Sequence, residues 1–191
     1  RVQGALEGLE ELFHAQVPPE NVAAIVFEPV QGEGGFIVPP KQFVRGLREL
    51  ASKHGIVLVD DEVQAGLGRT ARMFAIEHFG VQPDLVCTAK ALGGGLPISG
   101  LTGRAEIMDA PVPGSIGGTF GGNPLACVAA LENLRLIESS LGAAARLGRE
   151  VTKRLAEMRE THPLVGDVRG LGCMQALEFV RDPRTKEPAK E

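Results

Sequence analysis

Hydrophobic residues recur at helical spacing in several parts of the chain and form short continuous runs in others. Residues 4–15 place Leu9 and Phe13 on one face, which predicts an amphipathic helix ended by the prolines that follow it. Residues 41–54 repeat this spacing before a glycine that suits a left-handed C-cap. A shorter helical pattern covers residues 73–79.

Three apolar runs of strand length alternate with these helical segments. They cover residues 22–27, 56–59 and 85–87. The order strand, helix, strand, helix, strand is typical of a doubly wound parallel sheet, so we expect an α/β fold with helices flanking a mainly parallel sheet. The first run is almost continuously apolar and is therefore expected to be a buried strand.

The second half of the chain combines a glycine-rich segment with further helical patterns. Residues 93–123 are punctuated by glycine and are predicted to form a long functional loop. An Asn-Pro pair then suits the start of a helix, and a second helix is predicted over 141–160. Residues 166–180 indicate a glycine turn followed by a strand. We expect part of a large domain over 1–138, and a linking helix with the start of a C-terminal α+β domain over 139–191.

Composition and charge narrow the class of protein. Of the 191 residues, 43% are hydrophobic and 23% are charged, which suits an ordinary globular domain. The net charge of -4 and the lack of a basic block argue against nucleic acid as a partner. No apolar run approaches the roughly 20 residues that cross a bilayer, and the first residues lack a signal-peptide pattern. We therefore predict a cytoplasmic protein with no membrane partner.

The cysteines and the chain ends add two expectations. Cys87, Cys127 and Cys173 are odd in number, far apart and in apolar contexts. This pattern favours buried thiols over a disulfide framework or a zinc site. The chain begins with Arg1 rather than methionine and ends in a charged segment without a cap, so it looks like a central piece of a longer protein.

Charged residues follow each predicted strand, where the loops of a parallel sheet converge. Glu28 follows the first strand, Asp60 and Asp61 end the second, and Lys90 lies shortly after the third. A lysine enclosed among apolar groups is a nucleophile suited to imine chemistry. Adjacent Asp60 and Asp61 must point to opposite sides of a strand, so one carboxylate is expected in the pocket and no metal site is predicted. The competing interpretations are a solvated amine for Lys90 and a helix cap for Asp61.

Four segments carry this chemistry. They are EPVQGEGG at 28–35, LVDDEVQAGLGRT at 58–70, DLVCTAKALGGGLPISG at 84–100 and GGTFGGNPLACVAALE at 117–132. Taken together, they resemble the consecutive signatures of class III, or omega-amino-acid, aminotransferases. The resemblance implies fold type I of the PLP-dependent transferases, with pyridoxal 5'-phosphate (PLP) as cofactor. It also implies a homodimer whose subunits share their active sites.

The resemblance assigns four residues to the cofactor within one subunit. Lys90 matches the lysine that binds PLP as an imine and later moves a proton between substrate and cofactor. Asp61 matches the carboxylate that pairs with the pyridine nitrogen and keeps it protonated. Val63 matches an apolar residue on one face of the ring, with ordinary core packing as its competing interpretation. Gln64 matches a hydrogen-bond donor to the phenolic oxygen of the cofactor.

Two further residues are assigned to the partner subunit's cofactor and to the substrate. Thr119 matches a threonine that reaches across the dimer to the phosphate, and Glu28 matches a substrate-binding gate that pairs with an arginine. A structural acid before proline is the alternative for Glu28. Ala65 replaces the usual Thr or Ser of the family, and Arg169 is not a safe substitute for the gate arginine. The family's phosphate loop, its stacking aromatic residue and the gate arginine fall outside this chain.

The resemblance thus implies a transaminase that moves an amino group from an omega-amino acid, such as 4-aminobutyrate, to a 2-oxo acid, such as 2-oxoglutarate. We expect the 191-residue chain alone to have little or no activity. A PLP-dependent aminomutase, racemase or decarboxylase is the alternative within the same fold. An apolar strand ending in Asp-Asp-Glu also resembles the magnesium-binding strand of an ATPase, and a non-catalytic interaction module is the remaining alternative.

Overall fold

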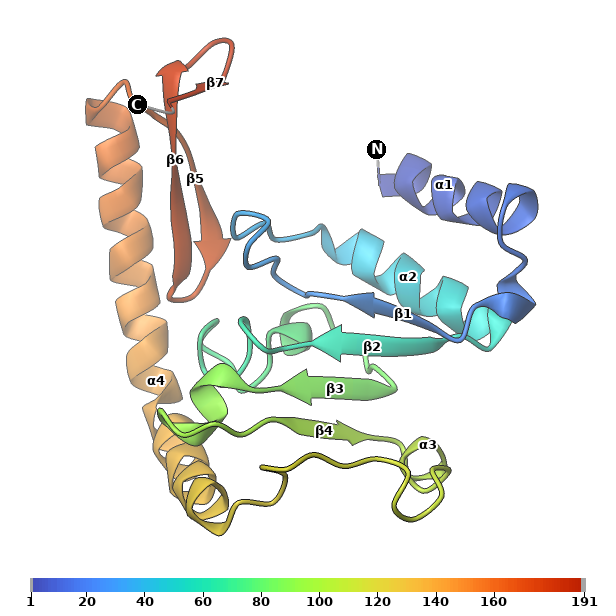
Figure 1. The fold of residues 1–191 in the computed structure, drawn as a ribbon. Helices are drawn as coiled ribbons and strands as arrows, with labels where there is room; N and C mark the ends of the chain where they lie inside the picture. Colours follow the sequence, from blue (N-terminus) through green and yellow to red (C-terminus); the bar gives the residue numbers. More distant parts are fainter. Residues whose placement is uncertain (1, 190–191) are drawn as a thin grey trace.

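The structure, a computed structural model, describes residues 2–189 and contains a larger and a smaller sheet joined by a long helix (Figure 1). The helices are α1 (Val2–Ala15), α2 (Lys41–His54), α3 (Ala105–Met108) and α4 (Pro124–Thr161). The 3₁₀ turns are η1 (Pro19–Asn21), η2 (Ala75–His78) and η3 (Lys90–Gly93). The strands are β1 (Ala24–Phe27), β2 (Val57–Asp61), β3 (Leu85–Thr88), β4 (Gly100–Gly103), β5 (Val165–Leu171), β6 (Met174–Asp182) and β7 (Glu187–Pro188).

The larger sheet has the strand order β1-β2-β3-β4. Strands β1, β2 and β3 are parallel, and β4 is an antiparallel edge strand. In Figure 1 the three parallel strands point toward α4 and the β5–β6 hairpin, so their carboxyl ends and the loops that follow meet there. The predicted α/β fold with a mainly parallel sheet is therefore confirmed. Helix α2 spans the predicted residues and ends at Gly55, a left-handed C-cap with φ 68°.

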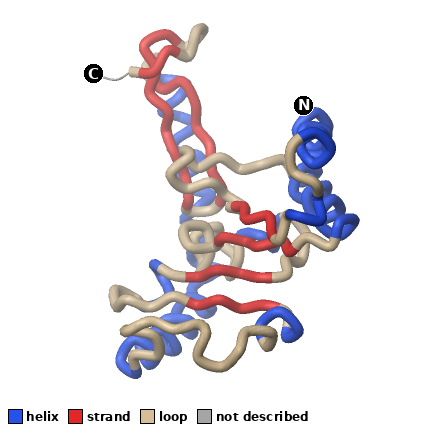
Figure 2. The backbone as a smooth tube through the Cα atoms, turned by 45° about the vertical axis from the view of Figure 1, so that its right-hand side comes forward, coloured by secondary structure: helices blue, strands red, loops and turns tan. Residues whose placement is uncertain are grey.

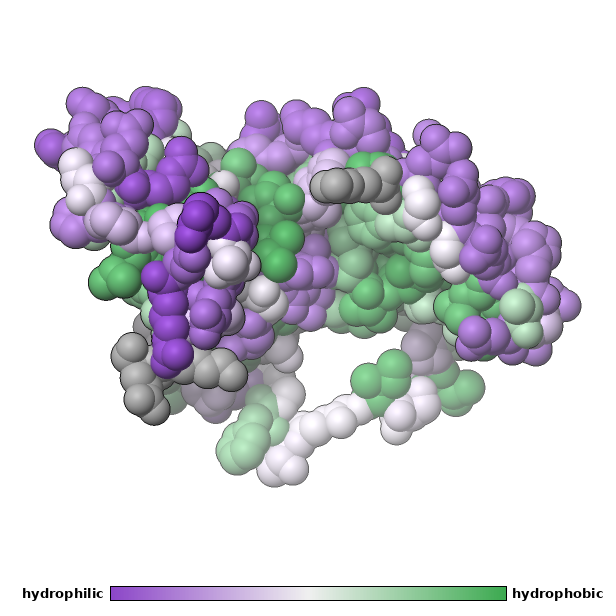
Figure 3. All heavy atoms as spheres, turned by 90° about the horizontal axis from the view of Figure 1, so that it is seen from above, coloured by the Kyte–Doolittle hydropathy of each residue, from purple (hydrophilic) through white to green (hydrophobic). Residues whose placement is uncertain are grey.

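One face of the larger sheet is covered by helices, and the described residues leave parts of the other face exposed, although Val59 in its centre is buried. Ile25 and Leu58 are neighbours on the covered face and belong to the core that α1 and α2 complete. On the other face, Val26 is 64% exposed and Leu101 is 49% exposed. The prediction of a buried first strand is therefore wrong, because the described residues leave its second side to solvent. Seen from above, the molecule also presents apolar surface between hydrophilic regions (Figure 3).

The two helices predicted after Asn123 are one continuous helix. Helix α4 starts where predicted, because the Asn123 side chain accepts hydrogen bonds from two backbone N–H groups of the first turn. The predicted break near residue 140 is wrong, because Ile137, Leu141 and Ala144 keep helical spacing across it and α4 is continuous from Pro124 to Thr161. The helix ends before His162, as expected. The predicted domain boundary at 138/139 lies inside α4 and stays a prediction.

The C-terminal segment forms an antiparallel hairpin that lies beside α4 (Figure 2). The predicted glycine turn over residues 168–172 is wrong, because residues 168–171 belong to β5 and pair with β6. The chain reverses at Gly172 and Cys173 instead. A Cβ placed on Gly148 of α4 would lie 2.6 Å from the carbonyl carbon of Gly172, so only glycine lets the helix approach the turn so closely.

Smaller departures from the sequence predictions concern loops and cysteines. The predicted loop over 93–123 contains β4 and α3, and the predicted helix over 73–79 is only the four-residue turn η2. The cysteines are half-buried rather than buried: Cys87 lies on β3, Cys127 on α4 and Cys173 in the turn between β5 and β6. None of the described helices is long and apolar enough to span a membrane.

Candidate active site

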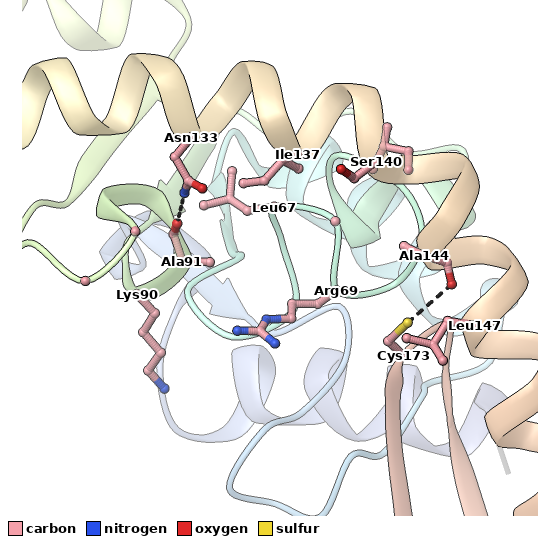
Figure 4. Close-up of a pocket in the computed structure, with 14 residues that line it drawn as sticks. Leu67, Arg69, Lys90, Ala91, Asn133, Ile137, Ser140, Ala144, Leu147 and Cys173 are labelled. Carbon is pink, nitrogen blue, oxygen red and sulfur yellow. Dashed lines mark hydrogen bonds between the residues drawn. The ribbon is translucent and has the colours of Figure 1, made fainter.

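Lys90 is held at the carboxyl edge of the larger sheet. The residue begins η3, two residues after β3 ends, and takes a positive φ of 39°. Helix α4 supports this turn, because the Asn133 side chain donates hydrogen bonds to the carbonyls of Ala91 and Leu92. Figure 4 shows Lys90 extending from η3 away from α4, in the same region as Arg69. The sequence therefore uses a strand end and a helix contact to fix the backbone of Lys90.

Asp61 occupies the matching position on the neighbouring strand. It lies opposite Cys87 in the parallel pairing of β2 with β3. Its Oδ1 atom accepts the backbone N–H of Val63 at 3.0 Å, which leaves the second carboxylate oxygen available. Since Lys90 follows Cys87 by three residues, the carboxylate and the amine leave the sheet at the same edge.

A pocket of about 190 Å³ brings three of the predicted residues together. Lys90, Val63 and Gln64 all contribute to its lining. A larger cavity of about 700 Å³ adjoins Lys90 on the side of α4 (Figure 4). Arg69 lines both cavities beside Lys90. Sequence reasoning did not assign a role to Arg69, although it belongs to the same motif as Asp61.

The Lys90 side chain is exposed in this chain rather than enclosed by apolar groups. The expected enclosure is therefore wrong for the described residues. The physical reason is that the site is exposed to solvent. Its residues come from β2, β3 and η3, and the described residues do not cover this part of the sheet face that carries Asp61.

Asp60 and Asp61 point to opposite faces of β2, as alternation along a strand requires. Asp60 is 0% exposed and Glu62 is 1% exposed, whereas Asp61 is half-buried. Neither Asp60 oxygen has a hydrogen-bond partner among the described residues. Burial, reinforced by the negative charge of Glu62, raises the pKa of Asp60 to about 9. Asp60 is thus a protonated core residue, and Asp61 remains the carboxylate at the site.

Glu28 and Glu33 are both anchored in the loop that follows β1. The Glu28 carboxylate accepts the backbone N–H of Gly32 at 2.5 Å and so closes the loop on itself. Glu33 instead accepts a hydrogen bond of 3.0 Å from the side-chain nitrogen of Gln64. The structure therefore places Glu33, and not Glu28, in contact with a predicted cofactor residue. Sequence reasoning missed Glu33, although the EPVQGEGG motif contains both acids.

Thr119 is not brought to this group. It lies in the exposed segment between α3 and α4, and it is absent from the lining of either cavity beside Lys90. The role that the resemblance gives to Thr119 requires a second subunit and stays a prediction.

The donor set at this edge fits PLP. Lys90 offers a primary amine, Asp61 a carboxylate bonded to the Val63 N–H, Gln64 a carboxamide and Val63 a branched apolar side chain; Lys90, Gln64 and Val63 line one pocket. These groups match an aldehyde carbon, a pyridine nitrogen, a phenolic oxygen and a ring face, respectively. Gly32 lies against the Gln64 carboxamide, which would have to shift to admit a Cβ at this position.

Comparison with known proteins agrees with this arrangement. The family model for class III aminotransferases matches residues 1–191, and the chain belongs to that family. The chain is 50% identical over 186 residues to 4-aminobutyrate aminotransferase of Escherichia coli K12. The match covers 96% of this chain and 44% of that protein. It is 47% identical over 189 residues to 5-aminovalerate aminotransferase of Pseudomonas aeruginosa, and that match covers 98% of this chain and 44% of that protein.

Solved structures confirm the fold. An omega-transaminase from Thermomicrobium roseum superposes with a TM-score of 0.90 at 37% identity, covering 97% of this chain and 43% of that one. A PLP-bound amine transaminase from an uncultivated Pseudomonas species gives a TM-score of 0.90 at 37% identity, with 98% and 44% covered. The predicted fold type I is therefore confirmed. The chain spans less than half the length of these relatives. Because the whole chain matches the aminotransferase family, the ATPase alternative is set aside.

Proposed function

We propose that this chain forms the catalytic core of a PLP-dependent transaminase that moves an amino group from an omega-amino acid, such as 4-aminobutyrate, to a 2-oxo acid, such as 2-oxoglutarate. The observation that carries the proposal is the convergence of Lys90, Val63 and Gln64 on one pocket beside Asp61. The substrate class is supported by relatives named 4-aminobutyrate and 5-aminovalerate aminotransferases.

Bound PLP supplies an electron sink for the carbanion that forms when the substrate loses a proton. Lys90 anchors the cofactor and, as a free amine, takes and returns that proton at its Nζ atom. The Asp61 carboxylate holds a proton on the pyridine nitrogen, because a negative charge beside the nitrogen favours its cationic form. Both roles need groups at the same sheet edge, where β2 and β3 place them.

Val63 and Gln64 complete the cofactor contacts of one subunit. Val63 would pack on the ring face, and the Gln64 carboxamide, held by its hydrogen bond to Glu33, would donate to the phenolic oxygen. Thr119 binds the phosphate in the partner subunit of a homodimer. The exposed apolar residues around the start of α4, such as Leu125, are consistent with burial in such a dimer. The cytoplasmic location stays a prediction.

Two carboxylates are available for substrate recognition in the loop after β1. Glu28 is the residue that the resemblance assigns as a gate, but its carboxylate already closes the loop through Gly32. Glu33 is exposed and lies beside Gln64, so it is better placed to meet an incoming substrate. We therefore retain Glu28 as the sequence-based candidate and propose Glu33 as its competitor.

A racemase is the second candidate function. The chain is 47% identical over 186 residues to a leucine/methionine racemase of Thermococcus litoralis, covering 96% of itself and 42% of that protein. Racemases and transaminases of this fold share the lysine and the aspartate. Retention of the amino group by the substrate distinguishes the racemase, so product analysis with a 2-oxo acid acceptor separates the two candidates.

Covalent trapping tests the proposal directly. The chain is incubated with PLP, reduced with borohydride and analysed by intact mass and peptide mapping. We expect one phosphopyridoxyl group on Lys90, and none on the Lys90→Ala variant. Lys186→Ala, which changes a lysine in the β6–β7 turn, serves as the matched control and should label like the wild type. Random labelling, or no labelling, would contradict the proposed cofactor site.

A further inference from the structure

The loop of residues 31–37 is closed by its own backbone. Gln31 donates to the Ile37 carbonyl at 3.0 Å, and the N–H groups of Gly35 and Phe36 donate to the Gly32 carbonyl at 3.0 and 3.3 Å. Gly35 and Phe36 both have positive φ values, of 108° and 54°. Such a conformation is costly for phenylalanine, so the surrounding structure must hold the loop in place.

The two sides of this loop contact different parts of the molecule. On one side, Glu33 accepts the hydrogen bond from Gln64, and Gly32 lies against the same carboxamide. On the other side, Arg169 of β5 donates from Nε to the Gly35 carbonyl at 2.6 Å. The loop therefore bridges the candidate cofactor pocket and the C-terminal hairpin, although Gly35 and Arg169 are 134 positions apart.

Arg169 is itself fixed on the hairpin by two acids. Its Nη1 atom donates to Asp167 at 3.0 Å and to Glu178 at 2.5 Å. Asp167 and Glu178 lie opposite each other in the β5–β6 pairing, which holds both carboxylates beside the guanidinium. These ion pairs raise the pKa of Arg169 above its usual range. The Arg169 side chain is only 25% exposed, so its geometry is constrained from both sides.

Apolar packing supports the same contact. Phe36 packs in a cluster that joins the loop to Leu171 of β5 and Met174 of β6. A Cβ on Gly35 would lie 2.9 Å from an Nη atom of Arg169, so the backbone comes as close to the guanidinium as glycine permits. The hairpin and the loop therefore meet through a packed interface with one charged hydrogen bond at its edge.

We propose that Arg169 is a positioning residue that clamps the 31–37 loop to the C-terminal hairpin, and that this clamp keeps Glu33 and Gln64 in place at the cofactor pocket. Arg169 touches neither the pocket nor Lys90. It acts through the Gly35 carbonyl, because a loop with two residues at positive φ relaxes when its outer contact is lost. The consequence for the cofactor rests on the proposed function, whereas the clamp itself does not.

Hydrogen exchange tests the clamp without any assay of activity. Four loop residues donate hydrogen bonds from their backbone N–H groups, namely Gln31, Gly32, Gly35 and Phe36. In Arg169→Gln we expect peptides covering 28–38 to exchange about tenfold faster or more, since a hydrogen bond from a charged donor is lost. Peptides of α2 should be unchanged. Arg184→Gln, an exposed arginine in the β6–β7 turn, is the matched control and should leave the loop unchanged.

If Arg169→Gln does not fold, two milder variants allow the same hydrogen-exchange test of the clamp. Arg169→Lys retains a charged donor without the planar fork, and Glu178→Gln removes one anchor while keeping Arg169. Each should accelerate exchange in 28–38 by less than Arg169→Gln and spare α2. Unchanged loop exchange in folded Arg169→Gln, or in both conservative variants if it unfolds, would overturn the clamp.

The cofactor provides a second, separable readout. After PLP is added, Arg169→Gln should still be trapped at Lys90, but the absorbance maximum of its bound cofactor should shift, because Gln64 is displaced from the phenolic oxygen. An unchanged spectrum would refute the link from the clamp to the cofactor. Failure of the wild type to label at Lys90 would refute the proposed function instead, while hydrogen exchange would still decide on the clamp.

Discussion

Asp61 and Cys87 lie directly opposite each other on the parallel strands β2 and β3. This pairing is the reason that Asp61 and Lys90 emerge at one edge of the sheet, because Lys90 follows Cys87 by three residues. Parallel strands joined by a crossover end in the same direction, so residues far apart in sequence meet at one edge of the sheet. The chemistry of the site therefore depends on strand register as much as on residue type.

Replacement of Asp61 tests the role of its carboxylate in binding the cofactor. Asp61→Ala should weaken PLP binding by about 10- to 100-fold, because a charge-assisted hydrogen bond is worth about 1.5–3 kcal/mol. It should also nearly abolish turnover in an active enzyme, since the pyridine nitrogen loses its counter-charge. Absorbance titration with PLP measures the affinity. Asp109→Ala, which removes an exposed acid next to α3, is the control, and equal affinity in both variants would contradict the role of Asp61.

Replacement of Asp60 tests whether this buried carboxyl, on the opposite face of β2 from Asp61, is protonated in the folded chain. The folded chain keeps a proton on Asp60 up to about pH 9, whereas an unfolded aspartate releases it near its ordinary value of 3.8. The folded state thus binds more protons across this window, so the contribution of Asp60 to stability falls as the pH rises from about 4 to about 9. Asp60→Asn cannot ionise and should flatten this dependence, so its stability relative to the wild type should rise by about 1 kcal/mol per pH unit across the middle of this window.

Urea unfolding at several pH values between 4 and 9 measures this effect. Asp109→Asn alters an exposed acid and should keep the pH dependence of the wild type. Parallel pH curves for the wild type and Asp60→Asn across this window would contradict the protonation of Asp60 in the folded chain.

The sequence predicted the parallel strands and α2 well, because their signals are local. An apolar run, a helical repeat before Gly55 and an Asn123 cap each depend on neighbouring residues alone. The break predicted in α4 failed because two adjacent helical patterns do not reveal whether the helix continues between them, as it does here. The exposure of Val26 could not be predicted, because an apolar run does not reveal which face is covered.

The site was predicted in part for a similar reason. Lys90 could be placed because its motif follows a strand end, whereas Val63 and Gln64 were assigned through the family resemblance; all three line one pocket. Contacts between distant segments were out of reach: the bond from Gln64 to Glu33 and the bond from Arg169 to Gly35 depend on how loops and the hairpin pack. The motif that contains Glu28 and Glu33 does not by itself tell which acid meets the pocket.

The open site leads to a prediction about activity. Lys90 is exposed and Thr119 lies outside the cavities beside it, so the chain by itself should turn over 4-aminobutyrate and 2-oxoglutarate at a small fraction of a complete enzyme's rate. Water that reaches the site weakens the electrostatic interactions that transamination requires. A coupled assay of glutamate formation, with 4-aminobutyrate aminotransferase of Escherichia coli as the positive control, measures it. Rates near those of the control would contradict the prediction.

Two glycines of α4 provide a matched test of how the hairpin docks. Gly148 touches the backbone of Gly172, whereas the nearest atom to a Cβ on Gly142 is 3.8 Å away, at the end of the Arg146 side chain. Gly148→Ala should therefore destabilise the chain by about 1–3 kcal/mol through overpacking against backbone that cannot move aside. Gly142→Ala should stabilise it by about 0.5–1 kcal/mol, because alanine favours the helix.

Urea denaturation of both variants gives the two free energies of unfolding, and hydrogen exchange over β5 and β6 locates the change. We expect faster exchange in the hairpin of Gly148→Ala, because α4 and the turn at Gly172 must separate to admit the methyl group. If Gly148→Ala instead raised the free energy of unfolding, α4 and the hairpin could not be packed as described. It would also remove the support that carries Arg169 toward Gly35.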